Sequence, residues 1–369
     1  MSQPEFPPPT ARLAGIDFAR GLAVFGMFAA HVGPDPAVEA GITGAVMQFT
    51  HGRSSALFAM LAGVSLALTT GRQQPEVGVQ GRQAVVRIVI RAVVLVALGM
   101  ALTMLDTPVD VIIAYYGVYF LLALPLIRLR ARTLAAVAAG LAVVGPLASF
   151  WVRSVVDFGA PDGIVGLLLT GTYPAITWMP FVIAGMALGR LDLGSPTVLR
   201  RLALLGPALG LLGYGGSWLA LEVFGGREAL LAGSPDALQQ LNSESGAVTT
   251  ESPAALLVAF PHSGTPFEIV GALGVAITVV PLAIAAVSRI RWLLLPVIAV
   301  GTMSLTAYVG HVLAIGALGV KELPGPSLTV LIGFIVVTTV AAALWKRLVG
   351  RGPLEYLVAL ATRPALLVR

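Results

Sequence analysis

The segment LAGIDFARGLAVFGMFAAH, which runs from Leu13 to His31, is almost entirely apolar. A helix needs about 20 such residues to cross the hydrocarbon core of a bilayer. Stretches of this kind recur along the whole chain. The spans that we predict are 12–33, 52–70, 84–105, 109–127, 133–152, 172–189, 199–221, 265–287, 292–316 and 327–349. The pattern indicates an all-α fold, a polytopic transmembrane helical bundle of about ten spans.

The composition excludes most other classes of protein. Of the 369 residues, 57% are hydrophobic and only 11% are charged, whereas a soluble domain carries roughly 25% charged residues. A soluble enzyme, a nucleic-acid-binding domain and a disordered chain are therefore excluded. The net charge of +5 comes from short basic clusters between apolar runs, where membrane topology explains them, so no nucleic-acid partner is expected. The chain has no cysteine, and we expect no metal site.

The lysines and arginines are concentrated in alternate loops, and this asymmetry predicts the topology. Short cytoplasmic loops of membrane proteins carry an excess of these residues. One set of loops, with both ends of the chain, holds all of the 23 basic residues except Arg53, Arg153, Arg227 and Lys321. We therefore predict that both termini are cytoplasmic and that residues 1–369 form a single transmembrane domain. The polar stretch at about 222–261 is then an outer loop.

Two ionisable residues of the first span, Arg20 and His31, are predicted to share one helix face. At about 100° per residue, the positions between them complete three turns with about 20° left over. Asp17 precedes Arg20 by three residues, a spacing at which the two side chains can pair. Ionisable groups inside a span are costly and usually face an internal cavity. The alternative is that Asp17 and Arg20 mark the cytoplasmic boundary and that His31 is an ordinary interfacial histidine.

The second segment, HGRSSALFAMLAGVS from His51 to Ser65, begins with polar residues on the predicted outer side. Arg53 breaks the positive-inside pattern beside His51 and Ser54, and an arginine there can bind an anionic or polyhydroxylated group. An ordinary contact with a lipid headgroup is the alternative. Further along the segment, Gly63 and Ser65 are expected to permit close helix packing.

All four histidines fall at the outer ends or outer halves of their helices under this topology. They are therefore expected to converge on one membrane face, where they supply groups that titrate near neutral pH. Polar residues of three other outer segments accompany them, and interhelical hydrogen bonding is the alternative role for those in the ninth span. These further candidate binding residues are Tyr173, Trp178, His262, Glu268, Tyr308 and His311.

Several motifs resemble the YeiB-like membrane protein family. They are RLAGIDFARGLAVFGM at 12–27, GRSSALFAMLAG at 52–63, GTYP at 171–174, AGMALGR at 184–190, GTMSLTAY at 301–308 and GPLE at 352–355. This family resembles heparan-α-glucosaminide N-acetyltransferase and, more distantly, the membrane acyltransferases that modify bacterial surface sugars. In the sugar acyltransferases an arginine, ten residues and a histidine form a first-helix motif, which Arg20 and His31 match. In the heparan enzyme the catalytic histidine lies after the first helix, where His51 is the nearest candidate.

The resemblance implies a multi-pass acyltransferase of the bacterial cell membrane. Acyl-CoA, expected to be acetyl-CoA, would be the co-substrate, with no permanently bound cofactor. The acceptor would be an amino or hydroxyl group, expected to belong to a sugar. His31 or His51 would act as general base or carry the acyl group, and Arg20 would position the donor. The alternatives are a transporter or flippase for an amphiphilic solute and a membrane protein without a ligand. A homodimer is compatible with the sequence.

Because the chain contains no cysteine, single introduced cysteines report the topology directly. If the termini are cytoplasmic, Ser243→Cys in the predicted outer loop should react with a membrane-impermeant thiol reagent in intact cells, whereas Gln74→Cys should not. The reverse labelling pattern would contradict the predicted orientation and place the histidines on the cytoplasmic side.

Overall fold

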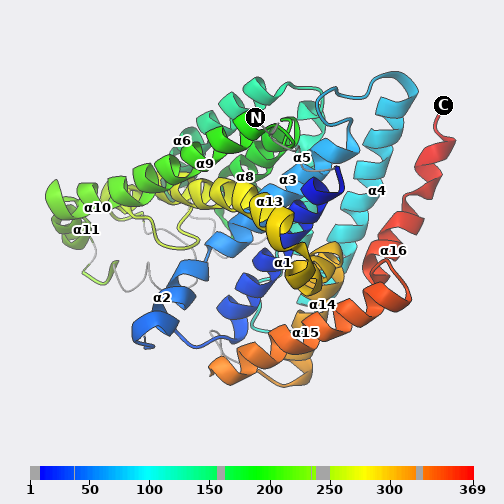
Figure 1. Cartoon of the computed structure of the whole chain (residues 1–369). Helices are drawn as coiled ribbons and strands as arrows, with labels where there is room; N and C mark the ends of the chain where they lie inside the picture. Colours follow the sequence, from blue (N-terminus) through cyan, green and yellow to red (C-terminus); the bar gives the residue numbers. More distant parts are fainter. Residues whose placement is uncertain (1–8, 37, 156–162, 234, 238–249, 321–326) are drawn as a thin grey trace, which may run out of the picture.

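The computed structural model describes residues 9–36, 38–155, 163–233, 235–237, 250–320 and 327–369. All of the secondary structure in these residues is helical, which confirms the predicted all-α fold (Figure 1). The longer helices are α1 (Pro9–Val32), α2 (Gly41–Thr50), α3 (Arg53–Thr69), α4 (Gly78–Thr103), α5 (Ile113–Ala123), α6 (Ala131–Val155), α8 (Ala175–Gly189), α9 (Pro196–Gly210), α11 (Gly226–Gly233), α13 (Pro266–Thr302), α14 (Ser304–Ala317), α15 (Leu328–Leu348) and α16 (Pro353–Ala361).

Every predicted apolar stretch has a helical counterpart in the described residues. Seven helical segments are long and apolar enough to cross a membrane, or eight if the bent pair Gly163–Thr170 and Ala175–Gly189 is one span. The shorter apolar helices Ile113–Leu126 and Ser304–Ala317 correspond to the remaining stretches. The bent pair meets at 57° across residues 171–174, so the bend precedes α8, and Pro180 lies within that helix.

The stretch predicted as one span at 292–316 is divided. Met303, with φ −123° and ψ 32°, ends α13 and begins α14. The boundary expected between 287 and 292 is instead a kink at Ile290, with φ −130° and ψ 36°, inside α13. The break at Met303 therefore allows α14 to take a different direction from α13. Tyr308 and His311 lie on α14.

Close approach of two helix backbones at glycine residues joins α1 to α13. A Cβ atom on Gly301 of α13 would overlap the backbone carbonyl of Asp17, and one on Gly21 of α1 would overlap that of Val297. Glycine at such positions lets two helix backbones approach each other. The same holds between α3 and α8, where Gly63 lies against Val182. The predicted packing role of Gly63 is thus confirmed, and α1 lies along α13.

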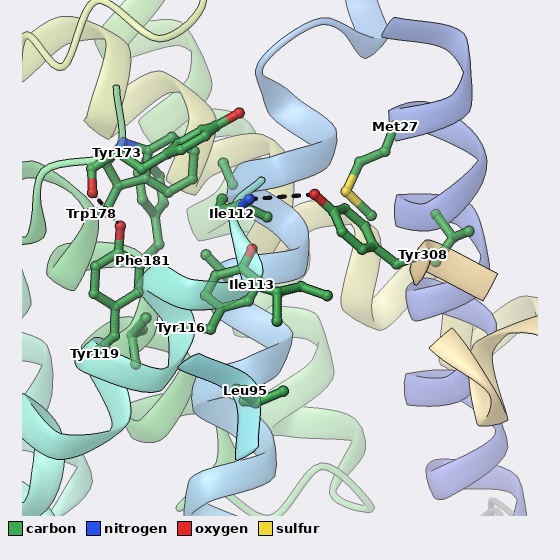
Figure 2. Close-up of a cluster of buried hydrophobic side chains, with 14 of the residues drawn as sticks. Met27, Leu95, Ile112, Ile113, Tyr116, Tyr119, Tyr173, Trp178, Phe181 and Tyr308 are labelled. Atoms are coloured by element: carbon green, nitrogen blue, oxygen red, sulfur yellow. Dashed lines mark hydrogen bonds between the residues drawn. The ribbon is translucent and has the colours of Figure 1, made fainter. Parts of the chain in front are cut away.

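Buried aromatic residues connect α5 to its neighbours (Figure 2). The hydroxyl of Tyr119 donates to the carbonyl of Tyr173 over 2.5 Å, and the amide of Ile112 donates to the hydroxyl of Tyr308 over 3.3 Å. Buried hydroxyl groups need such partners, because an unsatisfied polar group costs free energy. These bonds fix the loop before α8 and the middle of α14 relative to α5.

Part of the predicted outer loop folds into short helices. Leu230 of α11 and Ala255 of η5 (Pro253–Leu257) are fully buried in a small apolar cluster that also contains Val258. The hydroxyl of Ser217 donates to the carbonyl of Leu257 over 2.6 Å, which ties this cluster to the segment that follows α9. Residues 238–249 of the predicted loop lie outside the described residues.

Arg190, directly after α8, connects three loops that the sequence assigns to the arginine-rich side. Its Nη1 donates to the carbonyls of Thr70, over 3.2 Å, and of Arg72. Its Nη2 donates to Oγ1 of Thr70 over 2.9 Å and to the carbonyl of Ile127. The loops after α3, α5 and α8 therefore meet at one end of the bundle, which we call the arginine-rich end.

Removing the Arg190 guanidinium should destabilise the fold, because at least two carbonyls would lose their charged donor in a buried position. We expect Arg190→Met to lower the free energy of unfolding by about 2–3 kcal/mol. The measurement is denaturant unfolding in detergent micelles, with the exposed Arg200→Met as the matched control. Equal free energies of unfolding for the Arg190→Met and Arg200→Met variants would contradict the role of Arg190.

Candidate active site

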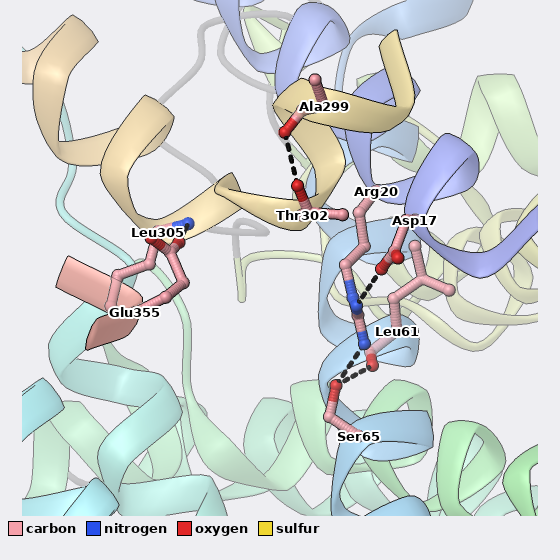
Figure 3. Close-up of polar contacts among 8 residues, drawn as sticks. All are labelled: Asp17, Arg20, Leu61, Ser65, Ala299, Thr302, Leu305 and Glu355. Carbon is pink, nitrogen blue, oxygen red and sulfur yellow. Dashed lines mark hydrogen bonds and ion pairs between the residues drawn. The ribbon is translucent and has the colours of Figure 1, made fainter. Parts of the chain in front are cut away.

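Arg20 lies in the half of α1 nearer the arginine-rich end, and its guanidinium is held by two partners (Figure 3). Its Nη1 donates to Oδ1 of Asp17 over 2.7 Å, and its Nη2 donates to Oγ of Ser65 over 2.7 Å. The predicted pairing of Asp17 with Arg20 is confirmed. Ser65 was expected only to permit close packing, but its hydroxyl directs Arg20 toward α3.

A cavity of about 480 Å³ opens beside Arg20. Arg87 and Arg91 of α4 line it as well, and their spacing of four residues places them on one face of that helix. The guanidinium of Arg91 lies 5.5 Å from the ring centroid of Phe120. With three arginines on its wall, this arginine-lined cavity is suited to an anionic ligand.

Glu355 also lines the arginine-lined cavity, but its carboxylate is engaged by α14. Its Oε1 accepts from the amide of Leu305 over 2.9 Å (Figure 3). The amide of Thr306 also donates to Oε1 over 3.1 Å, and the hydroxyl of Thr306 donates to Oε2 over 2.6 Å. A carboxylate at a helix N-terminus satisfies the free amides of the first turn. Glu355 therefore anchors the start of the helix that carries His311.

His31, near the other end of α1, forms a hydrogen bond with His311 of α14. Nδ1 of His31 lies 2.9 Å from Nε2 of His311, and the two ring planes differ by 9°. Since the centroids are 5.2 Å apart, the rings meet edge to edge, so that one N–H donates in the ring plane to the other ring's nitrogen. Phe28 and Tyr308 hold the His311 ring, with centroids at 4.9 Å each.

His31 also lines a second, small cavity of about 30 Å³. This volume accommodates about two water molecules. Its wall brings together several residues that the sequence singled out, with Ser55, Asp110 and Ile112 added by the structure. The predicted site residues among its lining are His31, Ser54, Tyr173, His262 and Tyr308.

A thin layer of side chains separates the two cavities. Tyr116 lines the arginine-lined cavity, and its hydroxyl donates to the carbonyl of Ser55 over 3.4 Å. Ser55 in turn lines the small cavity. A ligand in the arginine-lined cavity therefore lies within a few side chains of the histidine pair.

Six predicted site residues line neither of these two cavities. Two of them, Asp17 and His311, are the partners of Arg20 and His31 described above, and the other four lie elsewhere. One of them, His51, is buried with Nδ1 against the carbonyl of Met47 at 2.9 Å, at the end of α2. Trp178 is also buried, and its ring is stacked on that of His262 with centroids 5.8 Å apart.

Arg53 and Glu268 are the remaining two. The Nε of Arg53 donates to the hydroxyl of Tyr214 over 2.9 Å, with the guanidinium 4.5 Å from that ring's centroid. Glu268 is buried in the first turn of α13, where its amide donates to Oγ1 of Thr265 over 3.2 Å. These contacts fix the ends of α3 and α13.

Sequence reasoning missed Arg87, Arg91, Ser65 and Glu355 as site residues. The sequence groups Arg87 and Arg91 with the basic loop residues that predict the topology, yet both lie inside α4, beyond its first two turns. Their spacing of four residues within an apolar helix was the available signal. The role of Glu355 had no comparable signal, because its partners lie about 50 residues away.

Two parts of the chain match known protein families. Residues 12–208 match the family described as heparan-alpha-glucosaminide N-acetyltransferase, catalytic. The chain belongs to this family. Residues 245–364 match a second family, described as a protein of unknown function, DUF418. No curated protein matches the chain.

The resemblance found from the motifs is thus confirmed. Membership of the acetyltransferase family, with the apolar helices, makes the chain a multi-pass membrane protein with an acetyltransferase-like function. Arg20 and His31 lie in the region that matches the acetyltransferase family, whereas His311 and Glu355 lie in the second matched region. The histidine pair therefore joins the two regions.

The bond between His31 and His311 should be measurable as an energetic coupling. In a double-mutant cycle with His31→Ala and His311→Ala, we expect a coupling of about 1 kcal/mol in the free energy of unfolding. The corresponding cycle for His31 and His51 is the control and should give a smaller value. If the effects of His31→Ala and His311→Ala on the free energy of unfolding are simply additive, the two rings are not bonded in the folded protein.

Proposed function

We propose that this protein transfers an acetyl group from acetyl-CoA to an amino or hydroxyl acceptor, with the His31–His311 pair as the base. The observation that carries the proposal is the arginine-lined cavity, which a layer of side chains that includes Tyr116 and Ser55 separates from the cavity at His31, in a chain of the acetyltransferase family. The sequence resemblance suggests a sugar as acceptor, and the bacterial cell membrane as the location. The arginine-rich end would face the cytoplasm, where acyl-CoA is available.

The arginine-lined cavity supplies what an acyl-CoA donor requires. Its volume of about 480 Å³ lies within the range of small-molecule sites. The guanidinium groups of Arg87 and Arg91 suit the phosphate groups of coenzyme A, because arginine binds phosphate oxygens with two parallel hydrogen bonds. Arg20, fixed by Asp17 and Ser65, would hold the part of the donor nearest to the histidines.

The chemical step requires a base at the acceptor. The acceptor oxygen or nitrogen attacks the thioester carbonyl carbon, a C–O or C–N bond forms, and the C–S bond breaks. The acceptor proton passes to the imidazole pair, and the departing thiolate of coenzyme A then takes up that proton. General-base catalysis of this kind contributes about 10²- to 10⁴-fold in rate. The hydrogen bond between the rings stabilises the imidazolium that forms on either one.

The two family-matched regions work as one domain in this proposal. Because α1 packs along α13 and bonds to α14 through the histidines, neither region contains a complete site. We infer that residues 1–369 form a single functional unit.

The proposal is tested with purified protein in phosphatidylcholine vesicles, labelled acetyl-CoA and glucosamine as acceptor. We expect release of coenzyme A and formation of labelled N-acetylglucosamine. In His31→Ala we expect the rate of transfer to be lower by about 10²-fold or more. Label that stays on the protein without acceptor would indicate an acetyl-histidine intermediate. Movement of solute without coenzyme A release would favour a transporter and contradict acetyl transfer.

The arginines of α4 should control the affinity for the donor. We expect Arg87→Ala and Arg91→Ala each to raise the KM for acetyl-CoA by about tenfold or more, because a charged hydrogen bond to phosphate is lost. The control is Arg82→Ala on the same helix, whose side chain is exposed and donates to the carbonyl of Arg369. An unchanged KM in the Arg87 and Arg91 variants would exclude this cavity as the donor site.

A further inference from the structure

A third cavity, of about 580 Å³, forms a groove between α14 and α15. Its walls are apolar except at a few positions. Two of these are Thr306, whose hydroxyl donates to Glu355, and the buried His311. The apolar lining includes Ala307, Ala314, Phe334, Val337, Ala341 and Trp345.

Two glycines keep this groove open. Gly310 of α14 and Gly333 of α15 both line it, and a Cβ atom on either one would meet no described atom within 4 Å outside its chain neighbours and the nearby backbone of its own helix. Glycine inside a helix is unfavourable relative to alanine, and in membrane helices it usually serves close packing. These two glycines serve no such packing, so the space that they leave belongs to the groove.

The histidine pair separates two cavities of very different size. His31 lines the small cavity, and His311 lines the groove. The small cavity, at about 30 Å³, holds about two water molecules, which leaves no room for an acceptor. The groove, at about 580 Å³, is within the range of organic ligand sites. The acceptor therefore fits on the His311 side.

The surroundings of the groove are apolar as well. Helix α15 meets the criteria for a membrane span, and Val336, Val337 and Val340 of this helix are exposed. In a bilayer such side chains face lipid hydrocarbon. From Val330 to Trp345 the groove runs about 22 Å along α15, most of the roughly 30 Å of the hydrocarbon core. A ligand that enters here comes from the lipid phase.

We propose that the groove between α14 and α15 binds the hydrocarbon tail of the acetyl acceptor, so that the acceptor is a membrane-embedded amphiphile with a hydroxyl or amino head group at His311. This inference rests on the proposed acetyl transfer and specifies its acceptor. The apolar walls match an alkyl tail, and the single imidazole matches one hydrogen-bonding head group.

The transfer step remains balanced with the acceptor on this side. The head-group oxygen or nitrogen bonds to the acetyl carbon as the C–S bond of the thioester breaks. Nδ1 of His311, which has no hydrogen-bond partner among the described residues, takes up the head-group proton. The bond between Nε2 of His311 and Nδ1 of His31 stabilises the resulting positive charge until the thiolate takes up the proton. The first turn of α14 borders both substrate sites, since Leu305 lines the donor cavity and Thr306 lines the groove.

The test compares alkyl glucosaminides whose tails differ only in length. Methyl, octyl and octadecyl glucosaminide are offered in phosphatidylcholine vesicles with labelled acetyl-CoA. We expect about tenfold or more preference in kcat/KM for the octadecyl over the methyl compound, as contacts in an apolar site accumulate with tail length. Equal rates for all three tails would overturn the proposal.

Two phenylalanine variants of α15 separate groove binding from simple partition into the membrane. Gly333→Phe places a ring in the groove, and we expect the preference for the octadecyl tail to fall to near unity. Val336→Phe, at an exposed position of the same helix that does not line the groove, should keep the preference. A preference that Gly333→Phe leaves intact would show that tail length acts only through partition, and would overturn the proposal.

A photoreactive octadecyl glucosaminide, with a diazirine in its tail, tests binding without chemistry. We expect crosslinks on the groove-lining residues of α14 and α15 in the wild type and in Val336→Phe, but not in Gly333→Phe. Crosslinks in the groove without transfer to any acceptor would refute the proposed acetyl transfer while retaining the groove as an alkyl site. Crosslinks spread evenly over the exposed face of α15 would show ordinary annular lipid and overturn the proposal.

Discussion

The close packing of α1 on α13 is the constraint on which the site depends. Because Gly301 allows the α13 backbone to lie against Asp17, α1 is held with Arg20 at the arginine-lined cavity and His31 beside α14. The turn at Met303 then directs α14 so that His311 reaches His31. A bulkier residue at position 301 would separate α1 from α13 and with it the two halves of the site.

The charged groups that organise the interior of this bundle are each held by a defined partner. Arg20 is paired with Asp17, and Arg190 caps backbone carbonyls at the arginine-rich end. Glu355 satisfies the first amides of α14. Ionisable groups inside a membrane protein are costly unless they are paired or hydrated. Arg87 and Arg91 instead line a cavity, and in the proposed reaction they would bind the anionic donor.

The sequence predicted the parts of the site that depend on local periodicity. The pairing of Asp17 with Arg20 follows from a spacing of three residues, and Gly63 was identified as a packing residue. The partnership of His31 with His311 spans 280 residues, so no local pattern reveals it. No local pattern reveals the contact between Glu355 and Thr306 either. His51 could not be separated from His31 by sequence, because only the fold shows that its Nδ1 contacts the carbonyl of Met47.

In the proposed reaction, an acyl-CoA donor reaches the histidine pair from the arginine-rich end. The most direct measurement is an electron cryo-microscopy structure with a non-hydrolysable acetyl-CoA analogue. We expect phosphate density at Arg87 and Arg91, with the acyl carbon next to His31 and His311. An analogue bound at the opposite end of the bundle, with the arginine-lined cavity empty at saturating concentration, would contradict the proposed reaction.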